Sequence, residues 1–366
     1  MRTIYETIMT KKITAIACAV LLCHAAHAQK IPQNAGPEYY KTAEAQQIGN
    51  NILAHQRETG GWPKNTDMCR KLTPNQLDSV ASEMCLNDAT IDNGATITQM
   101  RFLAGLYAAT DESVYREHFV RGLRYILQGQ YGNGGWPQSW PNAKGYHMHI
   151  TYNDDAMANV MEMLLKIINN EYPYTGICDP EQTRMCAKAF NKGVSCILKT
   201  QIKSTHTPSG RKGLTIWCQQ HHEHTLQPAP ARAFEPAAYA STESAGIARL
   251  LMMIPNPGKK VIKSVTAAMQ WFDNYKITGY TYTRETQPDG GRLSELKATP
   301  EARTPIWGRF YDLDSCRVFV CGRDGIPRRS LNEIEPERRN GYAWYSARPV
   351  QLFEIYEEWK KKNNIR

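Results

Sequence analysis

Four arginines occupy positions whose neighbours are mostly apolar, aromatic or turn-forming. Arg309 and Arg323 lie fourteen residues apart among aromatic residues and glycines, in a segment with little helical character. Arg232 lies between two alanines, and Arg249 lies about two turns into a predicted helix. A guanidinium is costly to bury unless an anion compensates it, and its planar fork matches a carboxylate. The pattern predicts carboxylate binding, and the residues alone leave open whether the partner is structural, such as Glu235, or an acidic ligand.

Carboxylates gather at two equivalent positions, each just before a predicted helix. Asp92 and Asn93 precede one helix, and Asn153-Asp154-Asp155 precedes the next. Helix capping explains one carboxylate at each place. It does not explain Asp154 beside Asp155, and oxygen ligands collected from two neighbouring repeats suit a hard cation such as calcium. Capping and calcium binding both remain open on spacing alone.

Two further motifs have side chains suited to a binding cleft. Trp62 and Trp136 each follow a Gly-Gly pair, and an indole offers a flat face for a sugar ring, although it can equally close a helix end. The segment His221-His222-Glu223-His224 is rich in metal-ligand types but lacks the HExxH spacing on a helix. A polar loop lining a cleft is therefore favoured over a transition-metal site.

An internal repeat organises the elements that position these residues. Ile52-Leu53-Ala54-His55-Gln56 is followed by Gly60-Gly61-Trp62-Pro63. Ile126-Leu127-Gln128-Gly129-Gln130 is followed by Gly134-Gly135-Trp136-Pro137 at the same offset, 74 residues later. A third copy of the first half, Ile197-Leu198-Lys199-Thr200-Gln201, follows after another 71 residues. A repeat of this length indicates stacked supersecondary units, and packing alone is enough to explain its residues.

Apolar residues at three- and four-residue spacing predict helices within each unit. The predicted ranges are 40–56, 95–109, 113–129, 155–169, 183–201, 241–254 and 259–276. Strand patterns are short and lie late in the chain. The sequence therefore predicts a mainly α protein, an α/α-barrel (toroid-like) of about three helical-hairpin repeats, with long loops and a little β structure.

Composition and the N-terminal segment bound the class of protein. Lys11 and Lys12 precede an apolar run that ends near Ala26-His27-Ala28, which is the layout of a secretory signal peptide. We therefore expect a signal peptide at 1–28, export after cleavage near Ala28, and a single catalytic domain at 29–366 with no membrane span. Removing residues 1–28 lowers the formal net charge from +9 to +7. The sequence has no signature of a nucleic-acid-binding module, so an acidic polysaccharide is the favoured partner of this positive charge. The alternative, a basic surface with no anionic partner, stays open.

The motifs, taken in order, resemble those of the family 10 pectate lyases. The resemblance rests on the following motifs: the Gly-Gly-Trp-Pro pair, Thr90-Ile91-Asp92-Asn93-Gly94, Tyr152-Asn153-Asp154-Asp155, the segment from Trp217 to His221, Ala231-Arg232-Ala233, Trp307-Gly308-Arg309-Phe310-Tyr311-Asp312, Cys321-Gly322-Arg323-Asp324-Gly325 and Glu337-Arg338-Arg339-Asn340-Gly341-Tyr342. It covers residues 38–356. It implies an α/α-toroid-like fold and calcium-dependent β-elimination on polygalacturonate.

The resemblance also implies roles for single residues. Arg232 matches the arginine proposed to take the C5 proton. Arg309 and Arg323 match arginines that bind uronate carboxylates, and Arg249 matches a basic residue near the same subsites. Asp92 and Asp154 match carboxylates around the catalytic cation, and Asn93 and Asp155 lie beside them. We further assign Asn93, Trp62, Trp136 and His221 to substrate contact, and Asp155 to the metal site together with Asp92 and Asp154. One departure is His222, where the family is expected to carry Asp.

Physical chemistry supports these roles except at one point. A uronate C5 proton becomes acidic when the adjoining carboxylate is neutralised, which a divalent cation and clamping arginines achieve. The exception is Arg232, because arginine is ordinarily always protonated. Repulsion from Arg249, Arg309, Arg323 and the cation would favour its neutral form.

Two rival functions stay open. One is an α/α-barrel glycoside hydrolase that uses Asp154 or Asp155 with Glu223 as its carboxylate pair. The other is a non-catalytic protein that binds acidic glycans through Trp62, Trp136 and the arginines. For the enzyme we expect a monomer whose partner is polygalacturonate or pectin and whose cofactor is Ca2+.

Overall fold

The computed structural model describes residues 31–33, 35–288 and 290–365. The predicted signal peptide, residues 1–28, lies outside the described residues. Ten α-helices lie in the described part: α2 (Ala43–His55), α3 (Pro74–Ser82), α4 (Ile97–Thr110), α5 (Ser113–Gln128), α6 (Ala156–Ile168), α7 (Pro180–Thr200), α8 (Ser241–Met252), α9 (Lys259–Asn274), α10 (Pro336–Gly341) and α11 (Val350–Lys362). All seven predicted helices are confirmed to within a few residues at either end, while α3, α10 and α11 were not predicted.

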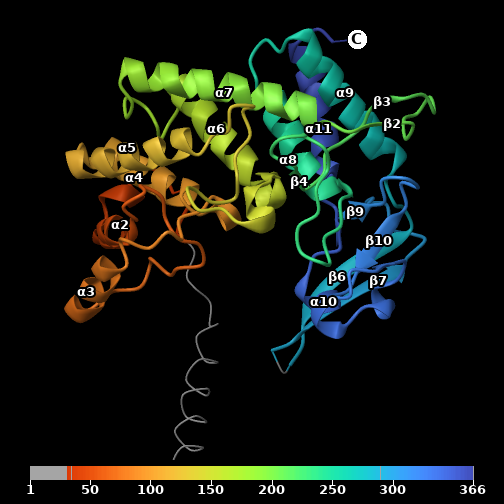
Figure 1. Cartoon of the computed structure of the whole chain (residues 1–366), viewed down its shortest axis with the longest axis horizontal. Coiled ribbons are helices and arrows are strands. Elements are labelled where there is room, and N and C mark those ends of the chain that lie inside the picture. The colour runs from red at the N-terminus through yellow and green to blue at the C-terminus, as the bar shows by residue number, and fades with distance from the viewer. Residues whose placement is uncertain (1–30, 34, 289, 366) are drawn as a thin grey trace, which may run out of the picture.

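The helices form two layers, as predicted for an α/α toroid (Figure 1). One layer contains α4, α6, α8 and α11, and each of these helices packs against the next. The other layer contains α2, α5, α7 and α9, which also pack in chain order. Each unit therefore supplies one helix to each layer and buries the apolar face of its neighbour.

The layer of α2, α5, α7 and α9 is the outer one, and a glutamine follows each of its first three helices. Gln56 donates from Nε2 to the carbonyl of His118 on α5 at 2.9 Å. Gln130 donates in the same way to Ala189 on α7 at 2.9 Å. Gln201 donates to Ser264 on α9 at 3.0 Å. These glutamines therefore link each outer helix to the next one. The repeated residues thus have a structural role, as expected if packing alone explains the repeat.

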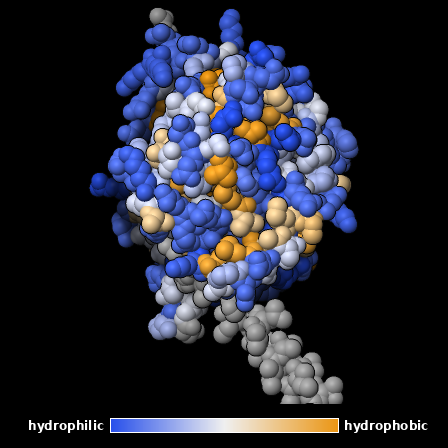
Figure 2. Space-filling model, turned by 90° about the vertical axis from the view of Figure 1, so that its left-hand side faces the viewer, coloured by the Kyte–Doolittle hydropathy of each residue, from blue (hydrophilic) through white to orange (hydrophobic). Residues whose placement is uncertain are grey.

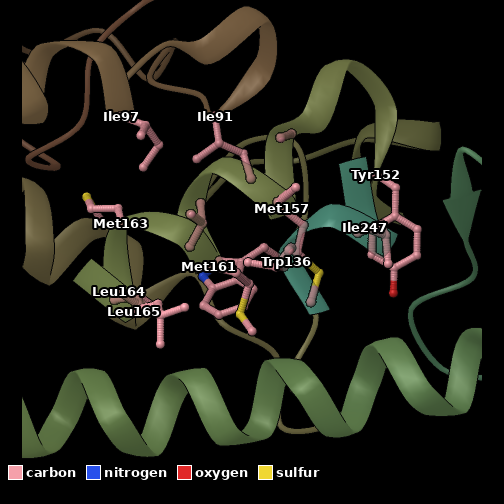
Figure 3. Close-up of a cluster of buried hydrophobic side chains, with 14 of the residues drawn as sticks. Ile91, Ile97, Trp136, Tyr152, Met157, Met161, Met163, Leu164, Leu165 and Ile247 are labelled. Carbon is pink, nitrogen blue, oxygen red and sulfur yellow. The ribbon is translucent and has the colours of Figure 1, made fainter. Parts of the chain in front are cut away.

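A tryptophan also closes the end of each outer helix. The Nε1 atoms of Trp62, Trp136, Trp217 and Trp307 donate to the carbonyl oxygens of Ile52, Ile126, Ile197 and Phe272, at 2.7, 2.8, 2.8 and 2.9 Å. Trp136 points into the core beside Met161 (Figure 3). Trp307 marks a fourth, more distant unit in addition to the three repeats recognised in the sequence.

The first glycine of each Gly-Gly pair is required by its backbone. Gly60 has φ +97°, and a Cβ atom there would lie 2.4 Å from the carbonyl oxygen of Arg121. Gly134 has φ +98°, and its Cβ atom would lie 2.1 Å from the carbonyl oxygen of Lys192. Because a side chain fits at neither position, the repeated glycines serve the approach of each loop to the next helix.

A β-rich part of the chain packs beside the helices and forms its own buried cluster (Figure 1). Its sheet has the order β11-β10-β9-β5. The bounds are β5 (Tyr239–Ala240), β9 (Phe310–Tyr311), β10 (Val318–Cys321) and β11 (Pro327–Arg328), beside the hairpin of β6 (Tyr280–Thr286) and β7 (Arg292–Ala298). Short ribbons join β1 (Ile150–Thr151) to β4 (Gln220–His221), β2 (Lys203–Ser204) to β3 (Gly213–Leu214), and β8 (Trp307–Gly308) to β12 (Tyr345–Ser346).

Hydrophilic residues dominate the face of the molecule shown in Figure 2, and apolar residues form a broken stripe across it. Among the described helices, none is both long enough and apolar enough to cross a membrane.

Candidate active site

Two short 3₁₀ turns lie against each other at one rim of the helical layers. They are η2 (Asp92–Gly94) and η4 (Asn153–Asp155), the two equivalent junctions of the repeat. Asn93 and Asp154 occupy the same position in the two turns, and both have left-handed backbone, with φ of 51° and 49°. Left-handed conformation costs free energy at a residue other than glycine and is concentrated at functional sites. The repeat thus brings two oxygen-bearing side chains together.

A groove with three arms opens at these turns. Three adjoining cavities are each lined by both Asn93 and Asp154. One arm extends to Arg309 and Arg348, and another extends to Arg101 and Arg249. The third arm, of about 240 Å³, contains Asp92 and Arg232. The structure therefore places Asp92, Asn93, Asp154, Arg232, Arg249 and Arg309 around one groove.

Asp92 and Asp154 have oxygens suited to a hard cation. Asp92 is buried; Lys64 bonds its Oδ2 atom, and its Oδ1 atom has no hydrogen-bond partner among the described residues. The Asp154 carboxylate remains partly exposed. Burial raises the pKa of Asp154, Arg309 opposes that shift, and the charge of Asp92 adds to it. Two nearby carboxylates that repel each other are stabilised by a cation between them.

The neighbouring amides complete an oxygen-rich set. Asn93 donates from Nδ2 to Oδ1 of Asn65 at 3.2 Å. Its amide nitrogen is therefore engaged, and its amide oxygen remains available to bind a cation. The described residues contain no group of three or more His, Cys, Asp or Glu placed to hold a metal. The donors fit calcium, whose remaining ligands would be water and a substrate carboxylate.

Asp155 is not part of this set, and its prediction as a metal ligand is wrong for this structure. Its Oδ2 atom accepts a hydrogen bond from Arg348 at 2.7 Å. Its Oδ1 atom packs so closely on α8 that a Cβ atom at Gly246 would lie 2.1 Å from it. Asp155 lines the first arm of the groove, but Arg348 engages one of its oxygens and α8 packs against the other.

Arg232 forms a two-pronged ion pair with Glu235. Its Nε atom donates to Oε2 at 2.7 Å, and its Nη2 atom donates to Oε1. Glu235 is buried and also accepts from the hydroxyl of Tyr342 at 2.8 Å. These hydrogen bonds raise the pKa of Arg232 further above its already high value, although burial opposes the shift. The structural partner suggested by sequence is thus present, and it holds the guanidinium protonated.

Three guanidiniums surround the ring of Phe234. The Cζ atoms of Arg338, Arg232 and Arg323 lie 4.1, 4.6 and 5.7 Å from the ring centroid. The negative face of an aromatic ring attracts cations, so Phe234 allows these like charges to gather. This ring brings Arg323 to the side of Arg232.

Arg309 is buried at the centre of a second charged cluster. It donates to Glu243 and, at 3.0 Å, to Oδ1 of Asn153, and its Cζ atom lies 4.4 Å from the ring centroid of Tyr342. Burial favours the neutral form of Arg309, but Glu243, Tyr342 and Asp154 raise its pKa well above the ordinary value. Arg309 is therefore a permanent cation in the wall of the groove.

The other two predicted arginines also have protein partners. Arg249 pairs with Glu162 in the second arm. Arg323 pairs with Glu337 through two hydrogen bonds of 3.0 and 3.1 Å, and its side chain is 62% exposed. An exposed ion pair is weak, so a uronate carboxylate can compete with Glu337 for Arg323.

Three predictions of substrate contact are wrong for this structure. Trp62 and Trp136 are 0% and 1% exposed, because both indoles close helix ends in the core. His221 is 0% exposed; it accepts from the Cys218 amide at Nε2, and its Nδ1 atom contacts the Leu226 carbonyl. None of these side chains presents a surface to a sugar.

The departure at His222 is explained by its turn. Its Nδ1 atom accepts hydrogen bonds from the backbone amides of His224 and Thr225, at 3.1 and 3.4 Å. A short carboxylate can accept the same bonds. His222 is not among the residues that line the three arms. The substitution therefore preserves the turn without changing the groove wall.

The carboxylate pair required by a hydrolase is not formed. Glu223 lines none of the three arms and bonds His149 at 2.8 Å. Burial opposes ionisation of Glu223, but the hydrogen bond from His149 lowers its pKa. A general acid needs the opposite shift, so Glu223 is unsuited to pair with Asp154.

Several residues of the site were not predicted from sequence. In the sequence Arg338 stands out only as part of a motif. Glu243 belongs to Ser241-Thr242-Glu243-Ser244-Ala245, a degenerate third copy of the junctions at Asp92 and Asp154. Tyr342 links the two clusters because its hydroxyl reaches Glu235 and its ring faces Arg309. The available signal was the third junction itself, where Glu243 stands at the start of a helix equivalent to those after Asp92 and Asp154.

Stacked helical pairs and a groove of acidic and arginine side chains are features expected of a polysaccharide lyase, and comparison with known proteins identifies that class. The chain belongs to the pectic acid lyase family, whose model matches residues 56–353. It is similar to the family 10 polysaccharide lyase from Cellvibrio cellulosa, with 29% identity over 88% of this chain and 94% of that chain and a TM-score of 0.74. A mutant of that enzyme, in complex with trigalacturonic acid, matches with the same identity and TM-score over 88% and 95% of the two chains. No curated protein matches the sequence. The family resemblance, the mainly α fold and the enzyme class are thereby confirmed.

Proposed function

We propose that this lyase cleaves α-1,4-linked polygalacturonate by calcium-assisted β-elimination, with Arg232 as the base for the C5 proton. The observation that carries the proposal is the third arm of the groove, where Arg232 shares one cavity with Asp92 and Asp154. The similar enzyme from Cellvibrio cellulosa, in complex with trigalacturonic acid, supports the substrate class.

The reaction breaks the C5–H and C4–O4 bonds and forms a C4=C5 double bond. Arg232 takes the C5 proton, and the electron pair leaves with O4, which takes a proton from solvent. Arg309, Arg323 and Arg249 bind and orient the uronate carboxylates, for which a guanidinium fork is better suited than an ammonium group. Asp92, Asp154 and the amide of Asn93 would hold calcium. When bound, calcium neutralises the substrate carboxylate and so acidifies the C5 proton.

The Arg232–Glu235 ion pair sets a condition on this mechanism. It favours the protonated guanidinium in the free enzyme, so base catalysis requires substrate binding to weaken the pair. Positive charge from Arg309, Arg323 and the cation works in that direction. Glu235 thus positions Arg232 and, at the same time, opposes its deprotonation.

One assay tests the function. Purified enzyme is incubated with polygalacturonate, and the ultraviolet absorbance of the unsaturated product is followed with and without EDTA. A calcium-dependent lyase gives absorbance that EDTA abolishes and added calcium restores. New reducing ends without absorbance would identify a hydrolase, and binding without either product would identify a non-catalytic protein.

We further propose that the enzyme is exported and acts as a monomer. Export rests on the charged and apolar layout of residues 1–28. N-terminal sequencing of protein from the culture medium or periplasm should find cleavage near Ala28, and sedimentation should give the mass of one chain. An uncleaved N-terminus or a larger mass would contradict these expectations.

A further inference from the structure

A second cleft lies on the β-rich part of the molecule, apart from the groove. It has a volume of about 370 Å³ and opens between β7 and the loop that follows β11. Its lining includes Tyr280, Ser294, Lys297, Arg329, Asn332 and Arg339. A pocket of this size accommodates one or two sugar rings.

The two arginines of this cleft have only neutral partners. Arg339 donates to the side-chain oxygens of Asn332 and Asn340, both at 3.3 Å. Arg329 donates from Nη1 to the carbonyl oxygen of Val318 at 2.8 Å. Neither arginine forms an ion pair within the described part of the chain, unlike Arg232, Arg249 and Arg309 in the groove and Arg323 beside Phe234. Their charge is available to an anion.

The carboxylates near the cleft are already satisfied. Glu295 pairs with Lys297 at 2.8 Å. Glu333 accepts hydrogen bonds from the backbone amides of Arg329 and Ser330, at 3.2 and 2.8 Å, as the cap of a short turn. Asp312, whose pKa Arg329 helps to lower, accepts its strongest hydrogen bonds from Ser315, at 2.7 and 2.8 Å.

The remaining lining suits a sugar ring. Tyr280, at the start of β6, is 41% exposed and offers an aromatic face. Ser294, in β7, is 1% exposed, and its hydroxyl has no hydrogen-bond partner among the described residues. A buried unpaired hydroxyl costs free energy, which a ligand hydroxyl group in the cleft would offset.

The cleft and the active site lie on either side of α10. Arg338 and Arg339 are consecutive on α10, and Arg338 lies over Phe234 beside the proposed base. Asn340 accepts from the Ser294 amide at 2.9 Å as well as from Arg339. A single short helix thus separates the two sites.

We propose that this cleft is an accessory binding site for a uronate of the same polymer whose cleavage the groove performs. Arg329 and Arg339 bind the carboxylate, and Tyr280 packs against the ring. The identity of the polymer rests on the proposed function, whereas the affinity for a polyuronate does not. A polymer held at two sites of one molecule is bound more tightly than at either alone, so the cleft keeps long chains on the enzyme.

Affinity electrophoresis in gels containing polygalacturonate, run with EDTA to prevent cleavage, tests the proposal. The variant Arg329→Gln/Arg339→Gln should bind the polymer about tenfold or more weakly than the unsubstituted enzyme. The matched control Arg184→Gln/Arg211→Gln removes the same charge from exposed positions elsewhere and should leave the retardation nearly unchanged. Equal retardation of the cleft variant and the unsubstituted enzyme would overturn the proposal, as would an equal loss in both double variants.

Two further measurements distinguish uronate binding in the cleft from lost folding and from general charge attraction. Thermal melting of each variant shows whether lost binding reflects lost folding. The variant Tyr280→Ala removes no charge, and it should also weaken retardation if the ring contacts a sugar. Fully methyl-esterified pectin in the gel should retard the unsubstituted enzyme and the cleft variant equally. Since none of these readouts requires turnover, failure of the lyase assay would leave the cleft result intact.

Discussion

At the scale of single residues, the central feature is that the proposed base is held by a buried carboxylate. Glu235 receives three hydrogen bonds from Arg232 and one from Tyr342. Burial opposes ionisation of Glu235, but the contacts with Arg232 lower its pKa. Arg232 is thereby oriented accurately, and its proton is held firmly. Orientation and basicity make opposite demands on the same pair, and each can be tested by substitution.

Substitution of the base should abolish turnover while leaving polymer binding. Arg232→Ala should lower kcat by a factor of about 10² to 10⁴, because it removes the group that takes the proton. Arg232→Lys should restore little, since one ammonium cannot reproduce the two-pronged pair with Glu235. Initial rates of ultraviolet absorbance and gel retardation measure the two effects. Arg184→Ala is the control, and normal turnover by Arg232→Ala would contradict the assignment.

Removal of the Glu235 charge should shift the pH dependence of catalysis. Glu235 raises the pKa of Arg232, so Glu235→Gln lowers it, and more of the guanidinium becomes neutral at a given pH. Because only the neutral form of Arg232 can act as the base, we expect kcat/KM to rise with pH, and in Glu235→Gln this rise should move to lower pH. A uniform loss across all pH values, with no movement of the rise, would show that Glu235 only orients Arg232.

At the scale of elements, the two junction turns carry the proposed cation site. The turns η2 and η4 share left-handed backbone at Asn93 and Asp154, and packing of neighbouring units sets their distance. Backbone hydrogen bonds from the Ile91 amide to Gln138 and from the Asn153 amide to Gln219, at 3.0 and 2.9 Å, hold the turns against neighbouring loops. The outer helices of the same units are linked by the repeated glutamines, and tryptophans close their ends. Both features lead to predictions about binding and stability.

Calcium affinity should depend on two of the three predicted aspartates. Asp92→Asn and Asp154→Asn should weaken calcium binding at least about tenfold, since each removes a charged oxygen facing the cavity. Asp155→Asn should have a much smaller effect, because that carboxylate faces Arg348. Titration calorimetry with calcium alone measures this without turnover. Equal losses for all three variants would restore Asp155 to the ligand set.

The repeated tryptophans should contribute to stability and not to polymer binding. Trp136→Phe removes the donor to Ile126 and leaves a buried carbonyl unpaired, which should cost about 1–3 kcal/mol of unfolding free energy. Urea denaturation measures this, and Trp140→Phe, at a partly exposed indole, is the control. Weakened gel retardation by a Trp136→Phe protein of unchanged stability would support the rejected sugar-contact role.

Sequence predicted the regular parts of the molecule better than its side-chain roles. Helical periodicity located seven helices because their apolar faces are complete. The fourth unit was missed because the β6–β7 hairpin separates Trp307 from the helix it closes, which destroys the spacing of the repeat. Burial of Trp62 could not be predicted, because the motif does not fix the side on which the indole lies. Glu243 was missed because only folding brings it to Arg309.

At the scale of the whole molecule, positive charge should govern capture of the polymer. The chain has a formal net charge of +9, and four arginines surround Phe234 and Tyr342. Long-range attraction of a polyanion is strongly screened, with a Debye length of about 10 Å at 0.1 M salt and about 3 Å at 1 M.

Added salt should therefore raise KM for polygalacturonate much more than it changes kcat. Initial rates at fixed free calcium, with choline chloride as the added salt, measure both constants. A KM that stays constant over this range would show that contact within the groove, and not long-range attraction, limits capture.

The differences among the three junctions give the row of repeated units a direction. Asp92 and Asp154 lie in the corresponding turns η2 and η4 and offer oxygens to the groove, whereas Glu243 lies in the first turn of α8 and is neutralised by Arg309. A row of identical units would present the same surface at every step and could not distinguish the two ends of a bound chain. Here acidic and basic groups follow one another in a fixed order. On the proposed function, a polysaccharide, whose two ends differ, should bind in one preferred orientation, with one glycosidic bond beside Arg232.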